Sequence, residues 1–260
     1  MIIPVFLSGQ RKRGIKMSKV IAIIFAGGSG VRMGAGKPKQ FLEVNGKPII
    51  IHTLDIFENH PDIDEIFVAC KEEYIEKLRK MLGRFDITKV RDIVPGGTTG
   101  MGSIYNALMA AKKQNDEDAI VLIHDGVRPC INAALIDEVI KAVQKKGAVA
   151  TCTPLFETPI ISRNGECVEE TPARAECYTA QAPQAFRLGE ILAAHDSVRV
   201  DNPEYRGIID NCTLMHHLGW DVSIVKGPRT NIKVTTPEDL YIFKAMIEYR
   251  ETRDAFGMES

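Results

Sequence analysis

The chain has 260 residues, of which 45% are hydrophobic and 26% are charged, so it can bury a sizeable core without disulfides or a structural metal. Its net charge of −1 excludes a general electrostatic attraction to nucleic acid or to anionic membranes. The six cysteines include no C-x-x-C pair, which favours reduced thiols and a cytoplasmic location.

The N-terminal segment differs in character from the rest of the chain. Apolar residues 1–7 precede a basic cluster at residues 11–13, the reverse of the order in a secretory signal. Met17 stands directly before a strand-like run, so we expect residues 1–16 to be a flexible extension and residues 17–260 to be one domain. No stretch approaches the roughly 18 uninterrupted apolar residues of a membrane span.

Apolar runs typical of buried strands alternate with amphipathic segments typical of helices. The predicted strands cover residues 20–26, 65–70, 119–123, 148–153 and 221–225. After an interruption at residues 157–175, the fold resumes with residues 178–186. The predicted helices cover residues 48–58, 72–82, 103–112 with Ser103 as cap, 133–145, about 210–218, and a last helix opened by Thr236-Pro-Glu-Asp239.

This alternation predicts an α/β fold with a mostly parallel sheet and helices on both faces. Ligands of such sheets bind in the loops beyond the carboxyl ends of the strands. A glycine-rich loop, Gly96-Gly97 and His124-Asp125 all follow predicted strands. We therefore expect these loops to form the functional site.

Residues 157–175 interrupt the pattern. Two short runs, residues 159–162 and 167–170, flank Asn164-Gly165, a strong signal for a β-hairpin. An isolated hairpin is only marginally stable, so we expect a protruding β-arm that packs against something else, such as a second copy of the chain.

The loop after the first strand reads Ala26-Gly-Gly-Ser-Gly-Val-Arg-Met-Gly34. Glycines expose backbone N–H groups to a phosphate, and Arg32, Lys37 and Lys39 add positive charge for a polyphosphate. Met33 stands where a dinucleotide-binding fingerprint needs a third small residue, and Val31 where a P-loop needs glycine. The pattern predicts a nucleotide-phosphate site of another class; the alternative is a mobile surface loop.

Two charged residues follow later strands. Asp125 is placed to hold Mg²⁺ on a triphosphate or to bind a substrate hydroxyl, with a helix cap or an ion pair with Arg128 as the alternative. Lys233 could stabilise charge on a phosphate under attack, or it could be an exposed surface lysine.

Taken together, these segments resemble the cytidylyltransferase family that includes 2-C-methyl-D-erythritol 4-phosphate cytidylyltransferase and D-ribitol-5-phosphate cytidylyltransferase. The similar stretches run in the family's order over about residues 18–248: the glycine loop with Pro38-Lys-Gln-Phe-Leu42, Gly46-Lys-Pro48, His124-Asp-Gly-Val-Arg-Pro129, Gln181-Ala-Pro-Gln-Ala-Phe186 and Asn231-Ile-Lys-Val-Thr-Thr-Pro-Glu-Asp-Leu240. Each stretch is a weak signal, but the ordered set is a strong one.

The resemblance implies a Rossmann-like nucleotidyltransferase fold, a homodimer, Mg²⁺, and the substrates CTP and a small polyol phosphate. Arg32, Lys39 and Lys233 would be catalytic. The nucleotide-binding residues would be Ala26, Gly27, Gly28, Gly30, Gly97 and Ser103, the last two in the cytosine-recognition region. Asp125, Thr158 and Arg174 would contact the polyol phosphate, with Thr158 and Arg174 reaching the neighbour's site from the two ends of the arm.

Some positions depart from the family pattern. Gly100 stands where the family commonly has arginine, and Ala182 replaces the usual threonine before Pro-Gln. Val127, Arg174-Ala175 with Tyr178, residues 201–209 and Asp210-Asn-Cys212 look more like the ribitol-phosphate branch, with methylerythritol phosphate as the alternative substrate.

Two other classes of function stay open. A sugar-1-phosphate nucleotidyltransferase would share the first glycine-rich motif, but the arm and Asn231-Ile-Lys233 argue against it. A non-catalytic nucleotide-binding protein would keep the fold, but the retained charged residues argue against that.

Overall fold

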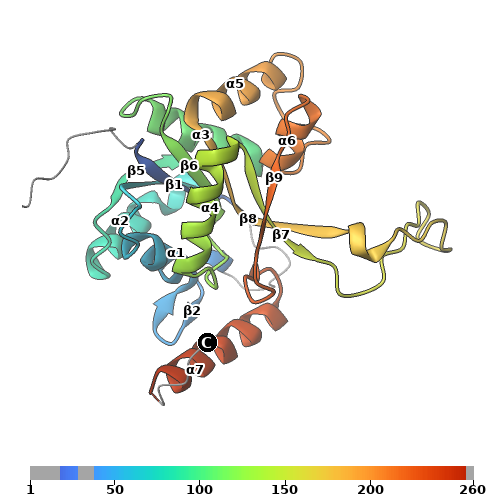
Figure 1. The fold of residues 1–260 in the computed structure, drawn as a ribbon. Helices are drawn as coiled ribbons and strands as arrows, with labels where there is room; N and C mark the ends of the chain where they lie inside the picture. Colours follow the sequence, from blue (N-terminus) through green and yellow to red (C-terminus); the bar gives the residue numbers. More distant parts are fainter. Residues whose placement is uncertain (1–17, 29–37, 256–260) are drawn as a thin grey trace, which may run out of the picture.

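The computed structural model describes residues 18–28 and 38–255 (Figure 1). Its elements in chain order are β1 (Val20–Ala26), η2 (Lys39–Phe41), β2 (Glu43–Val44), β3 (Lys47–Pro48), α1 (Ile49–Glu58), β4 (Glu65–Cys70), η3 (Glu72–Tyr74), α2 (Ile75–Arg84), β5 (Val90–Pro95), α3 (Gly100–Lys112), β6 (Ile120–Asp125), α4 (Ala133–Lys146), β7 (Val149–Pro154), η4 (Arg174–Glu176), β8 (Tyr178–Arg187), α5 (Leu188–Arg199), α6 (Asn211–His217), β9 (Ser223–Lys226) and α7 (Pro237–Ala255). The predicted extension at residues 1–16 lies outside the described residues.

In the part of the chain that the structure describes, the main sheet has the order β5-β4-β1-β6-β8-β7-β9. Its neighbours are parallel except where β8 runs antiparallel to β6 and β7. The predicted mostly parallel sheet is confirmed. Helices connect most successive strands, but β7 is connected to β8 through the arm, so β8 runs in the opposite direction.

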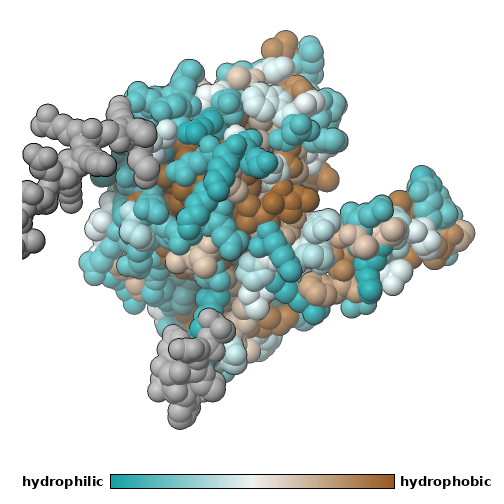
Figure 2. Space-filling model, viewed as in Figure 1, coloured by the Kyte–Doolittle hydropathy of each residue, from teal (hydrophilic) through white to brown (hydrophobic). Residues whose placement is uncertain are grey.

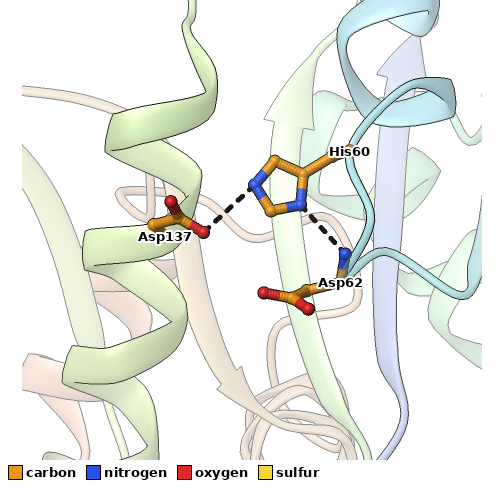
Figure 3. Close-up of side chains that lie close together, drawn as sticks. All are labelled: His60, Asp62 and Asp137. Carbon is orange, nitrogen blue, oxygen red and sulfur yellow. Dashed lines mark hydrogen bonds and ion pairs between the residues drawn. The ribbon is translucent and has the colours of Figure 1, made fainter.

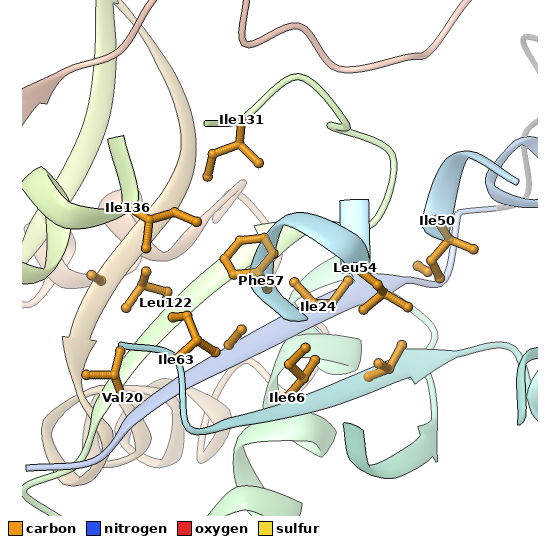
Figure 4. Packing of buried hydrophobic residues seen from close by; sticks show 14 of the residues in the cluster. Val20, Ile24, Ile50, Leu54, Phe57, Ile63, Ile66, Leu122, Ile131 and Ile136 are labelled. Atoms are coloured by element: carbon orange, nitrogen blue, oxygen red, sulfur yellow. The ribbon is translucent and has the colours of Figure 1, made fainter. Parts of the chain in front are cut away.

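Helices cover both faces of the sheet, as expected. Alternate residues of β1 point to opposite faces: Val20 and Ile24 pack with α1, α2 and α4, whereas Ile21 and Ile23 pack with α3, α5 and α6. Figure 4 shows the first of these clusters, with Phe57 of α1 near its centre. Burial on both faces explains why the central strands are continuous apolar runs.

Among the larger elements, β5 and α5 were not predicted. β5 has only Ile93 fully buried among its residues, as an edge strand does, so it lacks the apolar run of a central strand. α5 begins directly after β8, with no turn residue between them to announce a helix.

The predicted cap of α3 is wrong. Thr99 caps this helix by accepting a hydrogen bond from the Gly102 backbone N–H, and Ser103 lies one turn inside. The last helix does open as expected: it begins at Pro237, and Thr236 Oγ1 accepts a bond from the Asp239 backbone N–H at 3.4 Å. The Asp239 carboxylate in turn accepts from the backbone N–H of Thr236.

The segment between β7 and β8 extends away from the body (Figure 1). The two strands predicted within it are wrong: a single bridge joins Ile161 and Glu170. The turn takes up backbone donors that a ladder would use, since Asn164 Oδ1 accepts from the N–H groups of Glu166 and Cys167. We call residues 155–177 the arm; Figure 2 shows it standing free of the body.

α7 packs across the end of the molecule on a small apolar cluster that includes Val127, Val234 and Phe243. Among the described helices, α7 included, none is long and apolar enough to cross a membrane.

Candidate functional site

A cavity of about 600 Å³ opens at the carboxyl ends of β1, β4, β5 and β6. It brings together most of the predicted site residues, from segments far apart in the chain. Its lining includes Ala26, Gly27, Gly28, Lys39, Gly97, Ser103, Asp125 and Lys233. We call it the first cavity.

A buried amide holds the backbone at the end of β1, residues 26–28. Gln40 in η2 donates through Nε2 to the Ala26 carbonyl at 2.6 Å and lies 3.5 Å from the Gly28 carbonyl. Beside it, the Lys39 side chain enters the wall of the cavity and is only 8% exposed. A cationic group therefore lies next to backbone that is free of side chains, as a polyphosphate site requires.

Ser103 joins the two glycine loops. Its Oγ accepts from the Gly97 N–H at 3.1 Å and donates to the Thr99 carbonyl at 2.9 Å. A Cβ on Gly97 would lie 2.7 Å from the Gly102 carbonyl carbon, and one on Gly27 would lie 2.9 Å from Ser103 Oγ. At Gly97 a side chain would collide with backbone, and at Gly27 it would collide with the Ser103 hydroxyl, so both positions favour glycine.

Three charged groups meet where β6 ends. Lys233 Nζ lies 2.5 Å from Asp125 Oδ1, and Arg128 Nε lies 3.2 Å from Oδ2. Burial opposes ionisation of Asp125, but the two cations outweigh it and lower the pKa of the carboxyl. The Lys233 side chain is 41% exposed against 7% for Asp125, so the ammonium covers the acid and faces the cavity.

The backbone that carries Lys233 is anchored to the turn that follows β6. Arg128 donates through Nη1 to the Asn231 carbonyl at 2.7 Å, and the Val234 N–H donates to the Val127 carbonyl at 2.8 Å. Asn231 is fully buried and donates to the Ala182 carbonyl at 2.7 Å. The ammonium is thereby positioned largely by residues outside the first cavity.

His124 stays neutral beneath this cluster. Burial lowers its pKa to about 4, and its Nε2 lies 3.1 Å from the Arg128 carbonyl. A neutral ring under a paired carboxylate fits a structural role.

A second cavity of about 320 Å³ adjoins the first and shares Phe25, Gly100, Asp125 and Lys233 with it. Its remaining walls come from the end of β6, from β8 and from the start of α6. They include Arg128, Gln181, Ala182, Gln184, Asp210 and Asn211. The charged group at Asp125 and Lys233 therefore stands at the junction of two cavities.

Two of the predicted residues lie away from the cavities, and two more fall outside the described part of the chain. Thr158 and Arg174 are on the arm and line neither cavity; Arg174 donates to the Phe156 carbonyl at 3.2 Å. Gly30 and Arg32 lie outside the described residues.

Sequence reasoning missed several lining residues. Lys71 and Thr98 follow the carboxyl ends of β4 and β5, so the rule that located Asp125 could have found them. Gln184 and Asn211 line the second cavity from β8 and α6; both belong to segments that carry the resemblance, but neither was assigned a binding role.

The charge arrangement does not favour Asp125 as a ligand of Mg²⁺. Both of its carboxylate oxygens already contact cations, and a third cation would be repelled by Lys233 and Arg128. Its place at the junction suits acceptance of a hydrogen bond from a substrate hydroxyl instead.

A second polar cluster lies away from the cavities, where His60, Asp62 and Asp137 converge (Figure 3). His60 Nδ1 accepts from the Asp62 N–H at 3.2 Å, which leaves the ring proton on Nε2, 3.4 Å from Asp137 Oδ1. A metal would need the lone pair that this proton occupies. The cluster is better explained as a structural contact that holds the segment after α1 against α4.

The known proteins similar to this chain are cytidylyltransferases. Residues 20–249 match the family model described as 2-C-methyl-D-erythritol 4-phosphate cytidylyltransferase (IspD). A ribitol-5-phosphate cytidylyltransferase of Vibrio parahaemolyticus is 46% identical over 238 residues, which cover 91% of this chain and 99% of that protein. A 2-C-methyl-D-erythritol 4-phosphate cytidylyltransferase of Syntrophotalea carbinolica is 39% identical, with 88% and 96% covered.

Solved structures support the same family. The crystal structure of 4-diphosphocytidyl-2C-methyl-D-erythritol synthase from Anaerococcus prevotii superposes with a TM-score of 0.75 at 32% identity, over 89% of this chain and 96% of that one. The resemblance drawn from the motifs is confirmed. This chain belongs to the 2-C-methyl-D-erythritol 4-phosphate cytidylyltransferase family and is an enzyme of the nucleotidyltransferase class.

Proposed function

We propose that this enzyme transfers the cytidylyl group of CTP to D-ribitol 5-phosphate and forms CDP-ribitol and pyrophosphate. The observation that carries the proposal is the pair of joined cavities, which meet at Asp125 and Lys233. The first has the glycine loops and Lys39 to bind a nucleoside triphosphate. The second has amide side chains and Asp125 for a hydroxylated acceptor.

In the transfer, an oxygen of the acceptor phosphate attacks the α-phosphorus of CTP. A new P–O bond forms while the bond from the α-phosphorus to the bridging oxygen breaks, and that oxygen leaves with pyrophosphate. Lys233 at the junction, together with Lys39 and Arg32, stabilises the charge that grows on the phosphoryl oxygens. No nucleophilic side chain is needed, because both reactants are held in adjoining cavities.

Mg²⁺ would bind together with the nucleotide. The metal would neutralise oxygens of the triphosphate, as it does in other phosphoryl-transfer substrates. Asp125 is assigned to the acceptor, where its ionised carboxylate accepts from a hydroxyl.

The arm supports a homodimer. Its exposed apolar residues and the first residue of β8 include Phe156, Ile160, Val168 and Tyr178, each at least 47% exposed. A monomer seldom leaves so many large apolar side chains on a narrow projection. In the dimer, Thr158 and Arg174 of each arm would reach the neighbour's acceptor cavity, where the Arg174 guanidinium binds the acceptor phosphate.

Ribitol 5-phosphate is favoured over 2-C-methyl-D-erythritol 4-phosphate by the degree of similarity. Four relatives named for the first substrate are 43–46% identical to this chain, and four named for the second are 37–39% identical. The methylerythritol substrate remains the second candidate because the family model carries its name.

A pyrophosphate-release screen tests the proposal. Each of the four ribonucleoside triphosphates is combined with ribitol 5-phosphate, methylerythritol 4-phosphate or glycerol 3-phosphate. We expect release only with CTP, and fastest with ribitol 5-phosphate. Preference for UTP with a sugar 1-phosphate, added as a further arm, or no release with any acceptor would contradict it.

A further inference from the structure

A buried hydrogen-bonded chain leads to the second cavity. Tyr205 Oη lies 2.7 Å from His195 Nδ1, and His195 Nε2 lies 3.0 Å from Asn211 Oδ1. All three residues are at most 3% exposed, yet they come from α5, from the loop before α6 and from the first residue of α6. Nothing in the transfer chemistry requires a buried histidine there.

The protons of this chain can be assigned. Burial raises the pKa of Tyr205 to about 12 and lowers that of His195 to about 4, so the phenol is protonated and the imidazole is neutral at pH 7. Tyr205 therefore donates to Nδ1, and the single ring proton of His195 lies on Nε2 and is donated to Asn211 Oδ1. This fixes the orientation of the Asn211 amide, with Nδ2 on the side away from His195.

Asn211 Nδ2 differs from the other amide groups in the wall of the second cavity. The Gln184 amide donates to Asp210 Oδ2 at 2.8 Å and accepts from the Cys212 N–H at 3.1 Å. The Gln181 amide likewise donates to the Pro228 carbonyl at 3.3 Å and accepts from Asn231 Nδ2 at 3.4 Å. Among the described residues, none accepts a hydrogen bond from Asn211 Nδ2, although Asn211 is 2% exposed and lines the cavity.

We propose that Asn211 determines acceptor specificity by donating a hydrogen bond through Nδ2 to a hydroxyl oxygen of the polyol, with His195 and Tyr205 as positioning residues. The inference rests on the proposed function for the identity of the acceptor. A buried donor in a preset orientation favours an acceptor with oxygen at that place, because an analogue with hydrogen or methyl there leaves the donor unpaired. Asn211 thus selects an acceptor that carries a hydroxyl at the one position that Nδ2 contacts.

Asn211→Asp is the sharpest test, since it keeps the oxygen that His195 binds and removes the donor without a change of shape. We expect kcat/KM for ribitol 5-phosphate to fall about 10- to 100-fold, while KM for CTP stays within about twofold. Asn132→Asp is the matched control: Asn132 caps α4 through Oδ1, which aspartate retains, and lines neither cavity.

Analogues of ribitol 5-phosphate that each lack one hydroxyl identify the contact. We expect the wild type to discriminate strongly against one of them, and Asn211→Ala to remove that discrimination, as in a double-mutant cycle. Tyr205→Phe should raise KM for the acceptor without raising KM for CTP, which a general loss of folding would not do.

Acceptor kcat/KM within twofold of wild type in Asn211→Asp and Asn211→Ala overturns the inference, as does an equal loss on every analogue. If the wild type prefers another polyol phosphate, the proposed substrate is wrong, and the same variants are measured with the preferred one. Retained discrimination by Asn211→Ala against that acceptor's deoxy analogues would then overturn the role of Asn211 separately.

Discussion

The charged residues at the end of β6 are fixed by the body of the protein, whereas those at the tip of the arm are fixed mainly by one another. The side chains of Asp125 and Arg128 are at most 10% exposed, and Arg128 also binds the backbone of the segment that carries Lys233. On the arm, the Arg163 side chain is 67% exposed and pairs with Glu169 and Glu170.

This difference separates two kinds of functional residue. Those at the end of β6 are preorganised before substrate arrives, which suits charge stabilisation in a transition state. In the proposed dimer, those on the arm would act only when the partner's surface meets them. Substitutions in the body should therefore change the chemistry or the stability, and substitutions on the arm should change acceptor binding and assembly.

The largest effect is expected from Lys233→Ala. Loss of a preorganised cation at the transferred phosphoryl group should lower kcat about 100- to 1000-fold. Stopped-flow or steady-state pyrophosphate release measures it, and circular dichroism checks the fold. Lys244→Ala, at an exposed lysine of α7 outside both cavities, is the control. A kcat within threefold of wild type would remove Lys233 from the chemistry.

The body should also lose stability in mild acid, because it buries neutral histidines. The folded pKa of His124 is about 4, below the ordinary 6.5, so the unfolded chain binds the proton first as pH falls. Its contribution to the free energy of unfolding is complete above pH 6.5 and falls by roughly 3 kcal/mol between pH 6.5 and 4. Urea unfolding at a series of pH values measures the slope.

Two substitutions separate this effect from general acid sensitivity. His124→Gln should reduce the slope by about one proton, and His216→Gln, at an exposed histidine of α6, is the control for the substitution itself. Equal slopes in wild type and His124→Gln would show that His124 is not the group that titrates.

Arg174→Ala should behave as an arm substitution. Removal of a guanidinium that binds the acceptor phosphate should raise KM for the polyol phosphate about 10- to 100-fold, with no change in melting temperature. Arg163→Ala at the arm tip is the matched control. An unchanged acceptor KM would refute the phosphate contact.

Mixed chains sharpen this prediction. If the arm serves the neighbour's site, a heterodimer of Arg174→Ala and Lys39→Ala chains holds one site with both defects and one with neither. Activity should then return on mixing. Activity that stays lost, or a monomer in solution at the assay concentration, would contradict the shared site.

The smallest effect concerns the glycines of the nucleotide loops. A Cβ on Gly100 meets no atom within 4 Å, so Gly100→Ala should stabilise the protein by up to about 1 kcal/mol. Gly97→Ala, whose Cβ would approach Gly102 backbone at 2.7 Å, should destabilise the loop and raise KM for CTP. Thermal melts and CTP titrations compare the two, and equal behaviour would show that the close approach is unimportant.

Sequence reasoning predicted the parts of the fold that local chemistry determines. Central strands such as β1 are continuous apolar runs, and the loops after them identified Asp125 and the glycine-rich site. The half-buried edge strand β5 and the antiparallel direction of β8 depend on neighbours in the sheet, so no local pattern revealed them.

The candidate site divides in the same way. The first cavity is built largely from short motifs, which could be recognised in order along the chain. The second depends on contacts between β8, α5 and α6, such as His195 with Asn211, which lie 16 residues apart in sequence. The residues on either side of His195 and Asn211 in the sequence do not indicate this hydrogen bond, and only the folded structure reveals it.

The transfer itself can be followed with an isotopic label. Ribitol 5-phosphate labelled with ¹⁸O in its phosphate group is incubated with the enzyme, CTP and Mg²⁺, and both products are examined by mass spectrometry. Attack of the acceptor phosphate on the α-phosphorus predicts that all the label appears in CDP-ribitol and none in pyrophosphate. Label in the pyrophosphate, or loss of a labelled oxygen from the CDP-ribitol, would contradict the proposed reaction.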